Sequence, residues 1–191
     1  MLTLWAAIVA ERLGFDRPTA LTLGQAVAGL SAYAKGVSPG IIEPRPELVR
    51  ERGDQLAEGE RLHVDLLGRA VPMVRTDDGL RAVSKGKPGN PAQIEKYLAG
   101  KFGERLGDAR QAMAALAAAH EPADLYRLGF RLYEQFRPAV PTGESGWGAK
   151  GELDLRKVRA LVPTDLIGPP AHPSQTTWGG LRLAPNPTVP G

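Results

Sequence analysis

The residues with the clearest chemical potential are the lysines of Lys-Gly-Lys-Pro-Gly-Asn, at positions 85–90. Asn90 is a typical N-cap and Pro91 a typical first helical residue, so this run should lead directly into a helix. The free N–H groups and the dipole at a helix start favour an anion. We therefore predict that Lys85 and Lys87 bind an anion beside this helix start, for example a phosphate of a nucleic acid. The alternative is a flexible turn followed by a solvated helix face.

Positive charge continues along the predicted helix. Between positions 80 and 110 the chain carries seven basic and three acidic side chains, whereas the whole chain has a net charge of only +3. Lys101 and Arg105 are four residues apart and should stack on one helix face, while Lys96 is five residues from Lys101. Lys96, Lys101 and Arg105 are therefore further candidates for contact with an acidic partner.

A glycine-rich loop at 143–151 has the glycine spacing of a phosphate-binding loop but departs from its pattern. Ala149 precedes Lys150, Gly151 stands where a hydroxyl residue is required, and no strand leads into the loop. We expect a turn in which Trp147 fills the core, with Lys150 as a less favoured phosphate contact.

Groups that would indicate an enzyme are scarce. His63, His120 and His172 lie far apart without metal-ligand spacing, and cysteine is absent. Asp77 and Asp78 are explained by the chemistry of a turn. We expect no metal, no cofactor and no catalytic activity. An unrecognised enzyme is the third possibility for this chain, because carboxylates distant in sequence can meet in space.

The segment at 10–23, Ala-Glu-Arg-Leu-Gly-Phe-Asp-Arg-Pro-Thr-Ala-Leu-Thr-Leu, places small and turn residues at Ala10 and Gly14 and apolar contacts at Leu13 and Phe15. It resembles the helix-turn-helix of bacterial DNA-binding regulators. The predicted β hairpins at 62–84 resemble, more loosely, the wing of winged-helix proteins.

The resemblance implies that the second helix enters the major groove with its amino-terminal residues on the bases. Carried over, the base-reading residues are Arg17, Thr19 and Thr22, with Gln25 as an addition. The sequence departs from the pattern in one respect, because the helix has one charge near its start and none again until Lys35. The alternative is a helical hairpin packed in the core or against a second subunit.

Apolar periodicity, capping residues and turn signals place the elements that must position these residues. Helices are expected at 2–13, 18–35, 46–59, 91–106, 108–119, 122–136 and 154–161, and short strands at 62–67, 70–75 and 80–83. Pro72 argues that its strand lies at a sheet edge. Gly24 and Gly29 indicate close contact of the second helix with another backbone, including the possibility of a homo-oligomer through residues 17–35. The aromatic-dense helix, with Leu128 and Phe130, should organise the core.

These observations predict a mainly α protein with a small antiparallel β meander, that is, an α+β fold with a winged-helix-like core and extra carboxy-terminal helices. One compact domain should span 1–162. Residues 163–191 include seven prolines and should form an extended tail, in which the apolar segment around Trp178 is suited to docking on a partner. With no signal peptide and no run of about 18 apolar residues, we expect a cytoplasmic protein that does not span a membrane.

The preferred function is non-enzymatic DNA binding, as in a transcriptional regulator. The alternative is a protein-interaction or assembly module, such as a dimer.

Overall fold

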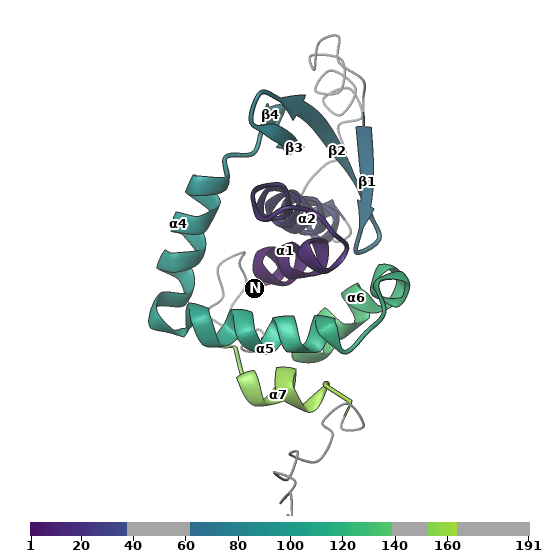
Figure 1. Ribbon diagram of the computed structural model, residues 1–191, viewed down its shortest axis with the longest axis vertical. Coiled ribbons are helices and arrows are strands. Elements are labelled where there is room, and N and C mark those ends of the chain that lie inside the picture. Colours follow the sequence, from purple (N-terminus) through teal and green to yellow (C-terminus); the bar gives the residue numbers. More distant parts are fainter. Residues whose placement is uncertain (38–61, 139–152, 164–191) are drawn as a thin grey trace, which may run out of the picture.

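The computed structural model describes residues 1–37, 62–138 and 153–163 (Figure 1). The described chain is mostly helical with one small antiparallel sheet, as predicted. Its elements in order are α1 (Leu2–Arg12), α2 (Arg17–Val37), β1 (Leu62–Leu66), β2 (Arg69–Thr76), β3 (Gly79–Ser84), β4 (Lys87–Pro88), α4 (Pro91–Phe102), a 3-10 turn (Gly103–Arg105), α5 (Leu106–Ala118), α6 (Pro122–Phe136) and α7 (Leu155–Ala160). The predicted helix at 46–59, the loop around Trp147 and Lys150, and nearly all of the predicted tail lie outside the described residues.

Helix α1 is the centre of the fold, with every residue from Thr3 to Ala10 buried. A helix that is apolar on all sides needs neighbours on all sides. Figure 1 shows α1 enclosed by α2, the sheet, α5 and α6. The indole Nε1–H of Trp5 donates a buried hydrogen bond of 2.7 Å to the carbonyl of Gly129 in α6. This bond satisfies the indole and fixes α6 against the central helix.

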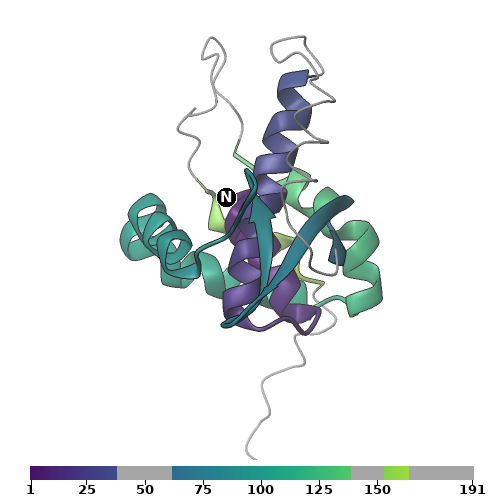
Figure 2. The same cartoon turned by 90° about the horizontal axis from the view of Figure 1, so that it is seen from above.

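Helix α2 packs closely along α1. A methyl group on Gly24 would meet the backbone oxygen of Thr3 and lie 2.9 Å from the nitrogen of Ala7. The predicted close contact at Gly24 is thus confirmed, and its partner is α1 of the same chain. Gly29 is exposed, and no atom of another element of the chain lies within 4 Å of such a methyl position, so it makes no close contact within the chain. The carboxy-terminal part of α2 extends beyond the body of the protein (Figure 2).

The sheet is a meander with the order β1-β2-β3-β4, and all its pairs are antiparallel. Val71, Met73 and Ala82 are buried on the face toward the helical core. The expectation that Pro72 marks an edge strand is wrong, because β2 lies between β1 and β3. Pro72 pairs with His63 of β1, and the β2–β3 ladder begins one residue later, at Met73. The missing N–H of Pro72 therefore falls where β2 has a partner on one side only.

Helix α4 begins as predicted, with the Asn90 side chain accepting from Gln93 N and Pro91 in the first turn. Its buried residues are Ile94 and Leu98. Tyr97, on the same helix, is 52% exposed. The predicted break at residues 107–108 instead occurs at Gly103, whose φ of +56° ends α4.

The aromatic-dense helix α6 packs into the core, as predicted. Leu125, Gly129, Leu132 and Phe136 are buried, and the rings of Trp5 and Phe136 meet edge to face with centroids 5.4 Å apart. Leu128 and Phe130, which were expected to organise the core, are only partly buried and pack against it.

Candidate nucleic-acid interface

Thr19 and Thr22 are only 2% and 1% exposed. The Thr19 hydroxyl donates to the carbonyl of Leu80 at 2.7 Å. The Thr22 hydroxyl donates to the carbonyl of Thr19, and its oxygen accepts from the N–H of Ala82 at 3.0 Å. The expectation that these two threonines are exposed to read bases is therefore wrong. Their side of α2 is covered by β3, and their hydroxyls fasten the helix to that strand.

Arg17 is exposed at the start of α2, where its Nε donates to Glu95 of α4 at 2.9 Å. The ion pair links the starts of two helices that are distant in sequence. Both partners are about half exposed, so it contributes little to stability. It does neutralise much of the charge that Arg17 was predicted to offer to DNA. Gln25, also on α2, is exposed.

The start of α2 carries a carboxylate. Oδ1 of Asp16 accepts the backbone N–H of Thr19 at 2.7 Å, which caps the helix. Hydrogen bonding by Thr19 lowers the pKa of Asp16, because it favours the charged form of the carboxylate. An ionised carboxylate at this helix start repels a phosphate, which further disfavours DNA contact at this end of α2.

Lys85 and Lys87 lie at an exposed hairpin. Lys85 (φ +54°) and Gly86 (φ +75°) form the two-residue turn between Ser84 and Lys87, the paired residues that close it. Two consecutive positive φ angles are typical of a tight hairpin turn, but Asn, Asp or Gly is usual at the first of these positions. The turn that was expected here as the alternative is a two-residue hairpin turn, and the hairpin presents both lysines to solvent.

The base of this hairpin is held firmly. Gly89 donates its N–H to the carbonyl of Ala82 at 2.8 Å. A methyl group on Gly89 would lie 2.9 Å from the side chain of Thr22. Thr22 thus bonds to β3 and lies close to Gly89, the residue that follows β4, so both ends of the hairpin lie against α2.

The start of α4, where an anion was expected, is already occupied by its own cap. Asn90 Oδ1 accepts the N–H of Gln93 at 3.3 Å, and Pro91 has no N–H to offer. Two of the donors that would hold an anion are therefore lost. The anion binding predicted for this segment therefore depends on the exposed lysines and not on the N–H groups at the start of α4.

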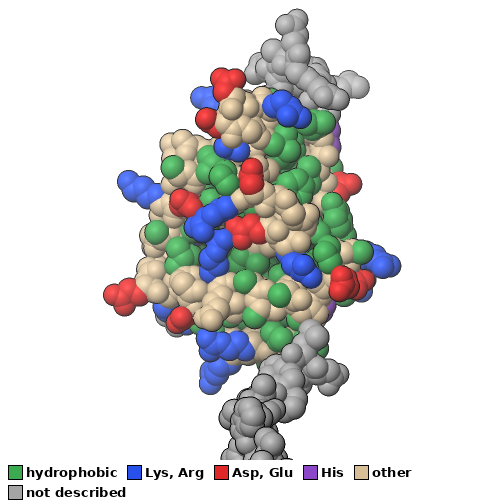
Figure 3. All heavy atoms as spheres, in the orientation of Figure 1, with side chains coloured by type: hydrophobic (Ala, Val, Ile, Leu, Met, Phe, Trp, Pro, Cys, Tyr) green, Lys and Arg blue, Asp and Glu red, His purple; other side chains and the backbone are tan. Residues whose placement is uncertain are grey.

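The remaining predicted basic residues are exposed but point in different directions. At 100° per residue, Lys96 and Lys101 lie about 140° apart around α4. Near the amino terminus, burial and then the charge of Lys101 lower the pKa of the Met1 amino group. Arg105 donates to the carbonyl of Leu153 at 3.1 Å. Figure 3 shows basic and acidic side chains interspersed over one face of the protein rather than gathered into one patch.

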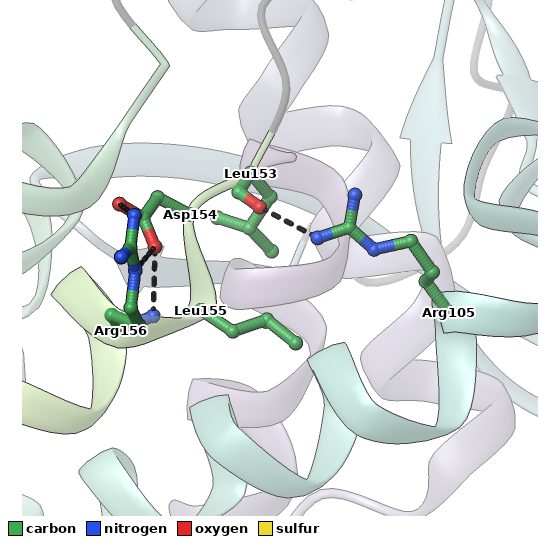
Figure 4. Close-up of a pocket in the computed structure, with 5 residues that line it drawn as sticks. All are labelled: Arg105, Leu153, Asp154, Leu155 and Arg156. Atoms are coloured by element: carbon green, nitrogen blue, oxygen red, sulfur yellow. Dashed lines mark hydrogen bonds and ion pairs between the residues drawn. The ribbon is translucent and has the colours of Figure 1, made fainter.

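Sequence inspection missed a second basic location, at α7. Arg156, Lys157 and Arg159 are exposed on this short helix, and Arg105 and Arg156 line an open pocket of about 460 Å³ together with Leu153, Asp154 and Leu155 (Figure 4). Three basic residues within Leu-Arg-Lys-Val-Arg-Ala, at 155–160, were the available signal. It is weak, because a charged face on a short helix is usually only solvated.

Among the described residues, no three His, Asp or Glu side chains converge as ligands for a metal. His63 is exposed on β1, and His120 is partly buried at the end of α5. No helix in the described part of the chain is long and apolar enough to cross a bilayer. Comparison of the chain with protein-family models, with curated proteins and with solved structures found no match.

Proposed function

We propose that this chain is a non-enzymatic DNA-binding protein that contacts the phosphate backbone through the β3–β4 hairpin. The observation that carries the proposal is the hairpin tip, where Lys85 and Lys87 are exposed while its base is bonded to α2 through Thr22. A cation held on a rigid element loses little conformational freedom on binding, so its contact with a phosphate is more favourable. This is the role of a wing in a winged-helix-like arrangement.

The burial of Thr19 and Thr22 changes the expected mode of binding. With those hydroxyls bonded to β3, the start of α2 offers DNA only Arg17, which is paired with Glu95. Contact through lysines and phosphates carries no sequence information by itself. We therefore expect binding with little sequence preference and strong dependence on salt.

The test is an electrophoretic shift with two unrelated duplexes over a range of salt concentrations. Each lost phosphate contact lowers the salt slope by about one, so Lys85→Ala with Lys87→Ala should lower it by up to about two for both duplexes. Arg131→Ala, an exposed change on α6, is the matched control and should leave the slope unchanged. An unchanged slope in the double variant would contradict the proposal, as would the absence of any shift with the unmodified protein.

A protein-interaction module is the second candidate, favoured by the part of α2 that extends beyond the body (Figure 2). Leu30 is 37% exposed there, beside the exposed Gly29. The close-packing face at Gly24 is used by α1, so a homo-oligomer through α2 would have to use this outer part of the helix. Light scattering across a concentration series tests it. A dimer that Leu30→Glu abolishes favours this candidate, and a monomer at every concentration contradicts it.

A further inference from the structure

The two outer strands of the sheet differ in how well their edges are protected. In the order β1-β2-β3-β4, each outer strand has a partner on one side only within the described part of the chain. The β4 edge consists of Lys87 and Pro88 alone, and short edges that carry lysine or proline resist further pairing. Strand β1 is five residues long, contains neither lysine nor proline, and pairs with β2 without a bulge. Figure 1 shows it on the side of the molecule away from α4. The β1 edge is therefore the one open to another strand.

The backbone groups at this edge follow from the register. A two-residue turn of positive φ angles joins β1 to β2, and Leu66 and Arg69 close it as a hydrogen-bonded pair. Hydrogen-bonded and non-hydrogen-bonded pairs alternate along an antiparallel ladder, so every second residue back from Leu66 points its N–H and C=O at β2. His63 pairs with Pro72, which has no N–H, in agreement with this alternation. The N–H and C=O groups of His63 and Asp65 therefore point away from β2, into the free edge.

These free groups are complementary to those of a second copy of the chain. When two β1 strands run antiparallel with Val64 opposite Val64, His63 of each copy lies opposite Asp65 of the other. Each of the two pairs exchanges two backbone hydrogen bonds, so all the free N–H and C=O groups of His63 and Asp65 find a partner. A register that placed Asp65 opposite Asp65 would instead oppose like charges, which is destabilising.

The side chains favour the same register. His63 and Asp65 are exposed and lie two residues apart, so they share the outer face of the sheet. In the pairing centred on Val64, each carboxylate lies opposite an imidazole, which has an N–H group to donate in either protonation state. On the other face the two Val64 side chains, half-buried in each copy, meet across the axis. Polar and apolar groups thus each face groups of their own kind.

We propose that two copies of this chain pair through β1, antiparallel and centred on Val64, so that their sheets become one continuous sheet. The interface is short, so we expect a weak dimer that forms as the concentration rises. It uses the opposite edge of the sheet from Lys85 and Lys87, so it does not depend on DNA binding by the hairpin. It also differs from an interface on α2, because Leu30→Glu should leave it intact.

A single introduced thiol reports the register directly, because the chain has no cysteine. In the proposed pairing the two Val64 Cα atoms are about 4.5 Å apart, within the range that a disulfide spans. Val64→Cys in the full chain should therefore form a disulfide-linked dimer on mild oxidation, seen on a non-reducing gel. His63→Cys is the control, since its two thiols would be diagonal neighbours about 7–8 Å apart, too far to bridge. Equally efficient cross-linking of both variants overturns the proposal, as does a Val64→Cys variant that stays monomeric.

Exchange of the two polar residues tests the pairing without a cross-link. His63→Asp opposes two carboxylates at both pairs and should raise the dimer dissociation constant by about tenfold, measured by analytical ultracentrifugation. Asp65→His removes both carboxylates and should also weaken the dimer. The double variant, with both changes, has the same two side chains in exchanged positions, so each imidazole again faces a carboxylate and the dimer should be restored. A double variant as weak as the single ones overturns the proposal, and so does a parent chain that is monomeric at every concentration.

Discussion

The hydroxyl oxygen of Thr22 accepts a hydrogen bond from the N–H of Ala82 at 3.0 Å, and both residues are buried. This contact joins a helix to a strand 60 residues further along the chain. It holds the hairpin that presents Lys85 and Lys87 at a defined position on α2. The hydroxyl that seemed suited to reading a base is a structural group.

Thr22→Val should therefore destabilise the protein. Valine has nearly the shape of threonine, but it leaves the buried N–H of Ala82 without a partner, at a cost of about 1–3 kcal/mol. Thr22→Ser keeps the hydroxyl and is the matched control, although it also loses a buried methyl group. Urea denaturation of both variants measures the difference. A valine variant as stable as the parent would show that this bond contributes nothing to the fold.

The two glycines of α2 should respond in opposite ways to alanine. At Gly24 the new methyl group would press on the backbone of α1 near Thr3, and such overpacking costs about 1–3 kcal/mol or more. At Gly29 nothing lies within 4 Å of the methyl position, so the better helix propensity of alanine should add up to about 1 kcal/mol. Thermal unfolding of the two variants tests the pair. A neutral change at Gly24 would contradict the close helix contact.

Two leucines of α6 that differ in burial allow a similar comparison. Leu125 is fully buried, whereas Leu128 is only partly so. Leu125→Ala should cost about 2–5 kcal/mol, because it removes many contacts and leaves a cavity. Leu128→Ala, the same chemical change three residues further on, should cost clearly less. Equal losses in denaturant melts would mean that the two faces of α6 are buried to the same extent.

The elements of this fold were largely predictable because their signals are local. Asn90 and Pro91 mark the start of α4, Asp154 caps α7, and Asp77-Asp78-Gly79 forms the turn between β2 and β3. Each depends on a residue type at one position of a helix or turn, without reference to distant parts of the chain.

Predictions of which side of a helix is buried were less successful, because burial depends on the elements that pack against that side. Thr19 and Thr22 lie three residues apart on one side of α2, but periodicity does not tell whether that side meets solvent or a strand. The pocket beside α7 was not predictable for the same reason. Its lining brings Arg105 against the carbonyl of Leu153, which is 48 residues away.

The capping carboxylate of Asp16 leads to a prediction about how the stability of the protein depends on pH. Hydrogen bonding by Thr19 lowers the pKa of Asp16 in the folded protein, while in the unfolded chain it should be about 3.9. A lowered folded pKa means that the unfolded state binds the proton more readily. The stability that Asp16 contributes is therefore fully present above about pH 5 and is lost as the pH falls through its folded pKa.

Asp16→Asn isolates this contribution, since asparagine also caps helices well but does not ionise. The free energy of unfolding of both proteins should be measured between neutral pH and the acid range. We expect the parent to lose more stability than the variant as the pH falls below about 5, so the two curves converge. Because Asp16 is exposed, solvent weakens its interactions, and the difference in stability between the two proteins should be small. Parallel curves over the whole range would show that the carboxylate has no preferential interaction in the folded state.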